Sequence, residues 1–265
     1  MVKNAIFFYM SHKKRVNIMY KGDIYTIYLT FMSVYDIIFP TILQERRKTM
    51  KSIPKTIDIF DCSHTMAAPL LSECEYPYEA LPKIKEFIKS CFDRLDDTYE
   101  KISEDVYIAK DAKVWPNTTI VGPTIIGHRT EVRPGAFIRG SVLVGDDAVI
   151  GNSTELKNCI VFDKAQLPHY NYVGDSIIGY KGHLGAGAIA SNLRLDRENI
   201  KIDGETLDIK KMGVCLGDLA EVGCGTVICP GTIIGRETLI YPVVTVKGVI
   251  PENKIFDGHR LKDRR

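Results

Sequence analysis

An apolar side chain recurs at every sixth position through much of this chain, and this period constrains the fold more than any other feature. Counting in sixes from residue 108 gives ten apolar residues in succession, and the count succeeds again between residues 216 and 246. The first run comprises Ile108, Val114, Ile120, Ile126, Val132, Ile138, Val144, Ile150, Leu156 and Phe162. A period of six fits neither a 3.6-residue helix nor a two-residue strand alternation, so it belongs to a larger repeating unit.

The unit that this period indicates is one short side of a β-solenoid. The aliphatic residue points inward, a small residue follows, and Gly, Asp or Asn turns the corner. Three sides close a triangular coil, and stacked coils share one core. We predict a mainly β fold, a left-handed parallel β-helix of hexapeptide repeats over residues 104–255, with a polar loop extruded at 193–212 and a basic tail at 256–265. An ordinary β-sandwich would have to match all ten positions by accident.

The first 49 residues differ in character from the rest. They carry eight Lys/Arg against three Asp/Glu, a net charge of +5, and residues 24–43 are apolar enough to be a weak membrane-span candidate. Asp36 and Pro40 within that stretch oppose a membrane span. We interpret residues 1–49 as an extension ahead of a natural start at Met50; a soluble appendage and a membrane anchor are the alternatives.

Residues 50–103 are expected to form a small helical cap. Between Tyr78 and Ile102 the apolar residues have helical spacing, with Pro82 tolerable in the first turn. We expect this cap to pack on the first coil and to cover its exposed edge, without chemistry of its own.

Composition narrows the class of protein. A net charge of +2 over 265 residues gives no electrostatic case for nucleic acid. The seven cysteines form neither a C-x-x-C pair nor a disulfide framework, and no secretory cleavage signal is visible, so a reducing cytoplasm is the expected compartment. We therefore predict a cytoplasmic protein, with membrane attachment disfavoured.

The six-residue count fails inside "LPHYNYVGD", residues 167–175. The repeat resumes at Ile178, sixteen rather than eighteen residues after Phe162. A break in a solenoid wall places side chains where regular packing would not. His169 and Tyr172 are therefore expected to leave the wall and to reach a groove.

The segment "LPHYNYVGDSIIGYKGHLGAGAIASNLRLD" carries a resemblance. It is similar to the acetyltransferase domain of the bifunctional N-acetylglucosamine-1-phosphate uridyltransferase/glucosamine-1-phosphate acetyltransferases, and more so to related archaeal sugar-phosphate enzymes. The similarity spans about residues 108–250, and its H-x-x-Y-x-G-D, G-A-G and Asn elements are specific. No Gly-rich nucleotidyl-transfer loop is present in the sequence.

The resemblance implies an acetyl-CoA-dependent hexapeptide-repeat N-acetyltransferase. Its acceptor would be an amino-sugar phosphate of the glucosamine 1-phosphate or galactosamine 1-phosphate type, in the synthesis of UDP-N-acetylglucosamine or a similar precursor of the cell envelope. His169 would be the general base, since an ordinary histidine titrates at about pH 6.5. Tyr172 would contact the acceptor and Asn192 would position it.

Three basic residues match substrate ligands of the family. Arg133 in "VRPGAF" and Lys157 in "STELKN" correspond to ligands of the sugar phosphate, and Lys201 to a lysine of the archaeal loop that helps to neutralise phosphate. One additional six-residue side separates Arg133 from Lys157 here, which is expected to displace Arg133 from the site. Glu198 stands where another loop lysine is expected, which weakens the case for a phosphorylated acceptor.

The resemblance also implies where acetyl-CoA lies. Gly185, Ala186 and Gly187 would keep a groove narrow for the pantetheine arm, and Cys224 replaces a serine near acetyl-CoA. Solenoids of this class form parallel homotrimers with acetyl-CoA between subunits, and the 193–212 loop would contribute across that interface.

Two other functions stay open. A solenoid that binds a sugar phosphate or nucleotide sugar without catalysis fits Glu198, Cys224 and the displaced Arg133. A zinc site like that of the γ-type carbonic anhydrases would use three histidines, but the short-spaced histidine pair of those enzymes is absent from the sequence. We expect no metal site.

Overall fold

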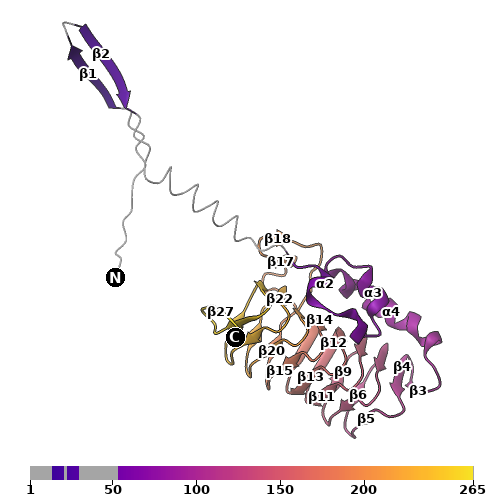
Figure 1. The fold of residues 1–265 in the computed structure, drawn as a ribbon. Coiled ribbons are helices and arrows are strands. Elements are labelled where there is room, and N and C mark those ends of the chain that lie inside the picture. The colour runs from indigo at the N-terminus through magenta and orange to yellow at the C-terminus, as the bar shows by residue number, and fades with distance from the viewer. Residues whose placement is uncertain (1–13, 21–22, 30–52, 265) are drawn as a thin grey trace. The chain divides into compact units, whose positions relative to one another are not determined.

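The computed structural model describes residues 14–20, 23–29 and 53–264 (Figure 1). By its contacts the chain divides into two units, Met1–Met50 and Lys51–Arg265, which are described separately. In the first unit, β1 (Lys14–Tyr20) and β2 (Asp23–Leu29) form an antiparallel hairpin. The membrane-span candidate at 24–43 begins in β2 and lies mostly outside the described residues. Among the described helices, none is long and apolar enough to cross a membrane.

The second unit begins with short helical segments. They are α2 (Thr56–Ile59), η1 (Cys62–His64), α3 (Ala68–Ser72), η2 (Pro77–Lys83), α4 (Ile84–Cys91) and η3 (Phe92–Arg94). The helix expected to reach Ile102 is shorter than predicted. Leu95 is extended, and the Asp96 carboxylate accepts the Thr98 N–H in a local turn that stops the helix. The following residues form β3 (Tyr99–Ser103), which pairs antiparallel with β4 (Val106–Ala109).

The remaining strands stack as three walls of a solenoid (Figure 1). The first wall holds β5 (Lys113–Val114), β8 (Glu131–Val132), β11 (Val149–Asn152), β13 (Gln166–His169), β15 (His183–Leu184), β20 (Glu221–Val222), β23 (Leu239–Ile240), β26 (Lys254–Phe256) and β27 (Leu261–Asp263). The second wall holds β6 (Thr119–Ile120), β9 (Phe137–Ile138), β16 (Ile189–Ala190), β21 (Val227–Ile228) and β24 (Thr245–Val246). The third wall holds β4, β7 (Thr124–Ile126), β10 (Val142–Val144), β19 (Val214–Leu216), β22 (Thr232–Ile234) and β25 (Val249–Ile250).

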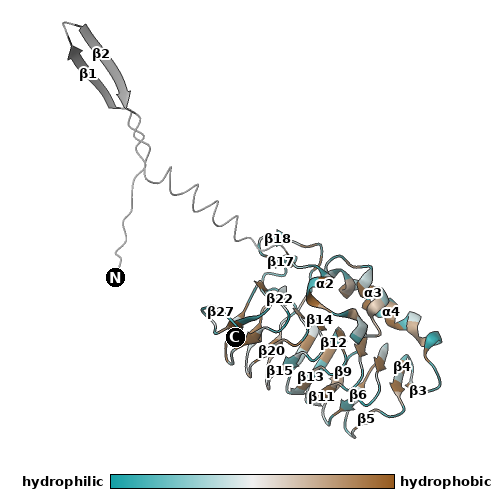
Figure 2. Cartoon of the chain, viewed as in Figure 1, coloured by the Kyte–Doolittle hydropathy of each residue, from teal (hydrophilic) through white to brown (hydrophobic). Residues whose placement is uncertain are grey.

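Two longer strands, β12 (Glu155–Val161) and β14 (Tyr172–Ile178), run from the second wall into the third. Apart from the first and last pairs, the ladders of the solenoid are parallel, so each coil rests on the one before it. Figure 2 shows hydrophobic residues gathered in the strands and hydrophilic ones in the turns. The predicted fold class, a left-handed parallel β-helix with helices at its N-terminal side, is confirmed.

The interior of the solenoid follows the six-residue count with one correction. Phe162 does not point inward: Val161 takes the interior position, and the Phe162 ring packs against Phe60 of the cap, with ring centroids 5.2 Å apart. The reason is a shortened side. Between Asp147 and Lys181, left-handed corner residues are spaced by five instead of six at two places, from Ser153 to Asn158 and from Tyr170 to Asp175.

These two short sides account for the sixteen-residue step seen in the sequence. The second lies inside residues 167–175, as predicted, whereas the first precedes that segment. The coils that contain them are 17 residues long, so Ile150 pairs with Leu167 and Gln166 with His183.

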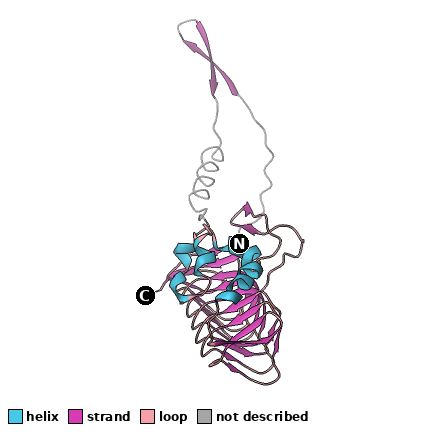
Figure 3. Ribbon diagram, turned by 90° about the vertical axis from the view of Figure 1, so that its right-hand side faces the viewer, coloured by secondary structure: helices cyan, strands magenta, loops and turns pink. Residues whose placement is uncertain are grey.

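The cap lies along the third wall and touches the first coil through Phe92, whose ring stacks on Tyr107 of β4 with centroids 4.6 Å apart, so the expected packing on the first coil was correct only in part. Outward-facing residues of this wall, such as Leu143, Ile160 and Ile177, share one buried cluster with Ile84 and Ile88 of the cap. Figure 3 shows the helices gathered on one side of the stacked strands. The third wall is apolar on both faces and therefore needs a cover. At the first coil, β3 pairs with β4 along one side.

The extruded loop, residues 193–212, lies with the cap over the outer face of the third wall. It contains the antiparallel strands β17 (Lys201–Ile202) and β18 (Glu205–Thr206), which confirms the hairpin signal at Asp203-Gly204. Both turn residues have positive φ, as a two-residue turn of this kind requires. Ile200, Ile202 and Met212 are fully buried in the cluster that covers the third wall. Among the described residues, the buried cluster formed by the cap and this loop includes strand residues of the third wall and none of the first or second.

Candidate functional site

His169, Ala186 and Cys224 occupy one corner of the solenoid in successive coils. This corner joins the first wall to the second, and backbone hydrogen bonds link its levels. Gly187 N–H donates to the His169 carbonyl at 3.0 Å, and Gly225 N–H donates to the Ala186 carbonyl at 2.8 Å. The predicted general base and the predicted acetyl-CoA residues therefore lie in one column, which we call the corner column.

The His169 backbone is fixed while its imidazole is left free. Asn171 is buried, accepts the His169 N–H through Oδ1 at 3.2 Å, and donates through Nδ2 to the Gly185 carbonyl at 2.8 Å. The imidazole is exposed and has no hydrogen bond or ion pair with any described residue. A side chain held in this way is available to a substrate.

The corner column also offers backbone donors. In the described part of the chain, neither the Ala186 N–H nor the Cys224 N–H donates to a protein acceptor. Gly185 is required by close packing of the coils, because a Cβ there would come within 2.6 Å of the Cys224 nitrogen. Gly187 has φ +71°, a conformation that favours glycine. The column is thus narrow and able to bind an extended ligand with hydrogen-bond acceptors.

Around the corner, on the second wall, lies a polar cluster formed by Tyr172, Asn192, Asp175 and Lys157. Asn192 Nδ2 donates to Asp175 Oδ2 at 2.5 Å, and Lys157 Nζ lies 4.0 Å from the same oxygen. A Cβ on Gly174 would come within 2.7 Å of both the Tyr172 hydroxyl and Asn192 Nδ2, so these two groups meet over a glycine. Three of the predicted substrate ligands are therefore brought together.

Neighbouring charges act on Tyr172. Burial raises the pKa of its phenol, the Glu155 and Asp175 carboxylates raise it further, and the Arg139 guanidinium opposes them. Arg139 itself pairs with Glu155 at 2.6 Å. The phenol therefore remains a hydrogen-bond donor at neutral pH.

Sequence reasoning gave no role to Asp175, Glu155 or Arg139. Asp175 belongs to the Y-x-G-D motif, which offered a signal. Glu155 and Arg139 carried no such signal. Glu155 pairs with Tyr172 because the coils here are 17 residues long, and Arg139 joins through its ion pair with Glu155.

Arg133 and Lys201 do not join the cluster. Arg133 Nη2 pairs with Glu131 at 2.9 Å. Arg133 lies on the first wall, two coils before His169, which is consistent with its expected displacement from the site. The Lys201 side chain is exposed in β17 and forms no hydrogen bond or ion pair with the described residues.

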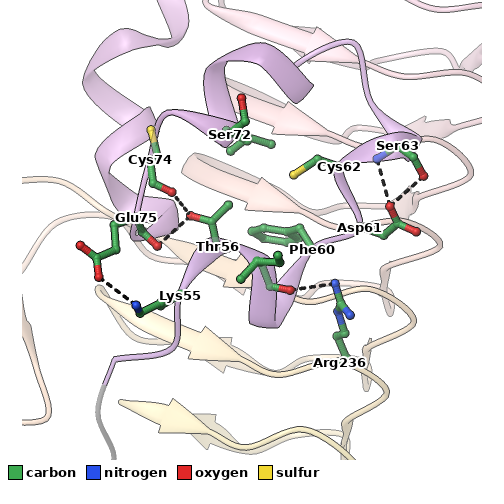
Figure 4. Close-up of a pocket in the computed structure, with 12 residues that line it drawn as sticks. Lys55, Thr56, Phe60, Asp61, Cys62, Ser63, Ser72, Cys74, Glu75 and Arg236 are labelled. Carbon is green, nitrogen blue, oxygen red and sulfur yellow. Dashed lines mark hydrogen bonds and ion pairs between the residues drawn. The ribbon is translucent and has the colours of Figure 1, made fainter.

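A cavity of about 630 Å³ is lined by residues of the cap and by Arg236 of the solenoid (Figure 4). None of its lining residues belongs to the corner column. Its cations already have partners: Lys55 pairs with Glu75 at 3.2 Å, and Arg236 donates to the Ile57 carbonyl at 3.2 Å. Burial raises the pKa of the Cys62 and Cys74 thiols in its lining, so these cysteines are poor nucleophiles. This arrangement favours a structural role.

Another cavity, of about 460 Å³, includes His183 with Gln166, Lys164 and Lys181 but not His169. Within the described residues, no group of three His, Cys, Asp or Glu side chains is arranged to hold a metal ion.

The sequence of this chain is similar to a family model and to curated proteins of archaea. A family model described as the GMPPB C-terminal domain matches residues 120–216. The bifunctional sugar-1-phosphate nucleotidylyltransferase/acetyltransferase of Sulfurisphaera tokodaii is 32% identical over 160 residues, which cover 59% of this chain and 40% of that protein. The bifunctional protein GlmU of a Methanococcus maripaludis strain is 32% identical over 171 residues, covering 62% and 42%. The chain thus spans about two fifths of the length of these curated relatives.

Among solved structures, PerB from Caulobacter crescentus in complex with CoA and GDP-perosamine is 20% identical, with a TM-score of 0.32, covering 59% of this chain and 56% of that one. The acetyltransferase domain of PglB from Neisseria gonorrhoeae, in complex with acetyl coenzyme A, is 17% identical, with a TM-score of 0.23, covering 60% and 57%. The sequence relatives confirm the resemblance carried by the segment from His169 to Asn192: over its solenoid this chain is homologous to the C-terminal region of bifunctional sugar-1-phosphate nucleotidyltransferase/acetyltransferases.

Proposed function

We propose that the solenoid is an acetyl-CoA-dependent N-acetyltransferase whose acceptor is an amino-sugar phosphate of the glucosamine 1-phosphate or galactosamine 1-phosphate type. The observation that carries the proposal is the arrangement of two neighbouring groups. His169, which has no side-chain partner among the described residues, lies on the corner column, and the Tyr172 cluster lies around that corner on the second wall.

In this reaction His169 accepts a proton from the acceptor amine as its nitrogen bonds to the thioester carbonyl carbon. The carbon–sulfur bond then breaks, and coenzyme A leaves as the thiol after taking up a proton. The free Ala186 and Cys224 N–H groups are suited to receive the negative charge that develops on the carbonyl oxygen. Gly185 and Gly187 leave the corner free of side chains where the pantetheine arm would lie.

The Tyr172 cluster suits the sugar phosphate. Tyr172 supplies a phenol donor, Asn192 an amide, and Lys157 a cation that is one third exposed. The pairing of Arg133 with Glu131 leaves Lys157 as the ligand of the phosphate within one chain. Lys201 is exposed on the loop, outside the Tyr172 cluster of its own chain. We propose that it contacts the phosphate bound to a neighbouring subunit.

We infer a parallel homotrimer with acetyl-CoA bound between subunits. The cap and loop cover the third wall, whereas exposed apolar side chains lie on the second wall and along its corner with the first. These are Phe137, Tyr170, Val227 and Val243. A contact between copies would bury them.

The test is release of thiol from acetyl-CoA by the purified full chain. The acceptors are glucosamine 1-phosphate, galactosamine 1-phosphate and the unphosphorylated amino sugars. Release with a phosphorylated acceptor supports the proposal and ranks the sugars. Binding of these sugars by calorimetry without thiol release would indicate the non-catalytic binding module instead, and neither turnover nor binding would contradict both.

A further inference from the structure

Asp175 lies at the centre of the polar cluster, although nothing in the proposed reaction requires it to touch a substrate. Its side chain is 9% exposed, and its backbone has φ +47° at the corner that ends the second short side. A carboxylate withdrawn from water costs free energy unless its oxygens are bonded. The contacts of those oxygens show what the residue holds in place.

Both carboxylate oxygens are occupied by side chains of neighbouring coils. Oδ1 accepts from Asn158 Nδ2 at 2.9 Å, and Oδ2 accepts from Asn192 Nδ2 at 2.5 Å. The three residues are spaced by 17, the length of the shortened coils, and therefore stack as an amide–carboxylate–amide ladder. Lys157 Nζ, 4.0 Å from Oδ2, completes the charge balance.

This ladder fixes the orientation of Asn192. An amide whose NH₂ group faces a carboxylate directs its carbonyl oxygen away from that carboxylate. Without the Asp175 anion, the Asn192 amide could rotate and the Lys157 ammonium would lose its nearest counter-charge. Asn158 Nδ2 also approaches the Leu81 carbonyl of the cap at 3.2 Å, so the ladder is anchored at its other end.

We propose that Asp175 is a positioning residue, which binds no substrate but holds Asn192 and Lys157 in the geometry that receives the amino-sugar phosphate. This inference rests on the proposed function and deepens it. It assigns acceptor recognition to a buried ladder of a carboxylate and two amides, whose 17-residue spacing reflects the two short sides, from Ser153 to Asn158 and from Tyr170 to Asp175.

The experiment is steady-state kinetics of Asp175→Asn in the full chain, with acetyl-CoA and the phosphorylated acceptor varied separately. Asparagine keeps the size and tolerates positive φ, but offers one acceptor where two amides need two. We expect KM for the acceptor to rise about 10-fold or more, because misplaced ligands lose binding steeply. KM for acetyl-CoA is expected to stay within about 2-fold, since the corner column does not contact the ladder.

Asp218→Asn is the matched control. Asp218 is equally buried, but its carboxylate accepts the backbone N–H groups of Asp61 and Tyr180 beneath the cap. A merely structural role for Asp175 would make both variants alike, with a lower unfolding temperature and unchanged KM values. Asn158→Ser removes one end of the ladder, and it is the test of the positioning role if Asp175→Asn does not fold. Serine occupies the same left-handed conformation at Ser141 and Ser153.

The outcomes separate the two proposals. An active wild type with an unchanged acceptor KM in Asp175→Asn, or in Asn158→Ser if the former is unfolded, overturns the positioning role and leaves the proposed function standing. A folded wild type that neither binds nor acetylates any amino-sugar phosphate overturns the proposed function, and the positioning role with it. A rise in acceptor KM alone, absent from Asp218→Asn, is the result that the structure predicts.

Discussion

His169 differs from His128 and His64 in having no side-chain partner among the described residues, a property that it shares with His183 and His259. His128 is held between Asp111 and Thr98, at 2.9 and 3.2 Å, and the His64 ring stacks on Tyr180. Its place in the H-x-x-Y-x-G-D motif made His169 identifiable from the sequence. The break in the six-residue count predicted that His169 leaves the wall, but not the buried Asn171, whose amide fixes the turn beneath it.

Replacing His169 by alanine is expected to lower kcat by about 10²-fold or more, because the base is lost. The melting temperature and the oligomer mass are expected to be unchanged, because the imidazole is exposed and makes no hydrogen bond or ion pair with a described residue. Thiol release and thermal unfolding measure the two effects, with the exposed His259→Ala as the control. Unchanged kcat would remove His169 from the mechanism.

Tyr172 is expected to act as a neutral donor over a wide pH range. Burial and two nearby carboxylates raise the pKa of its phenol, so the proton is retained between pH 7 and 9. Tyr172→Phe is therefore expected to raise the acceptor KM by about 3- to 10-fold, by the same factor at both pH values. A factor that shrinks towards pH 9 would show that phenolate forms and would contradict this assignment. Tyr241→Phe, on the first wall, is the control.

At the scale of elements, the six-residue count predicted the coils but not the side that the cap covers. The missed signal was a doubled aliphatic pair on every third side, as in Ile125–Ile126, Leu143–Val144 and Ile177–Ile178. One member of each pair faces the core and the other faces the cap. The short side before Phe162 shifts the interior position to Val161, and the count missed this shift because both residues are apolar.

The packing of α4 on the third wall gives a prediction about stability. Ile88 is fully buried in the cluster shared by cap and wall. Its replacement by alanine is expected to lower the free energy of unfolding by about 2–5 kcal/mol, with both KM values unchanged because α4 does not reach the corner column. Denaturant unfolding measures the loss. Ile57→Ala, whose side chain is largely exposed, is expected to change it by less than about 0.5 kcal/mol, and a comparable loss there would contradict this packing account.

At the scale of the whole molecule, the cap and loop cover the third wall of the solenoid, and the proposed site lies on the other two. The sequence could not place the site within an assembly, because inward and outward residues repeat alike in every coil. In the proposed trimer we expect Val243, an exposed apolar side chain one coil beyond Cys224 along the corner column, to lie in the contact between copies.

Sedimentation is expected to give three times the mass of one chain. Val243→Lys is expected to dissociate that particle and to abolish most turnover, because a site shared between copies is then incomplete. Ile57→Lys, a substitution on the cap, is expected to affect neither property. A monomer with full turnover would contradict the shared site.

The most direct measurement is the fate of a ¹³C-labelled acetyl group, followed by NMR in a mixture of the full chain, labelled acetyl-CoA and glucosamine 1-phosphate or galactosamine 1-phosphate. The account predicts that the label moves to an amide on the sugar nitrogen with wild-type protein, and far more slowly with His169→Ala. A label that stays on coenzyme A with every phosphorylated amino sugar, or that moves to a sugar hydroxyl as an ester, would contradict it.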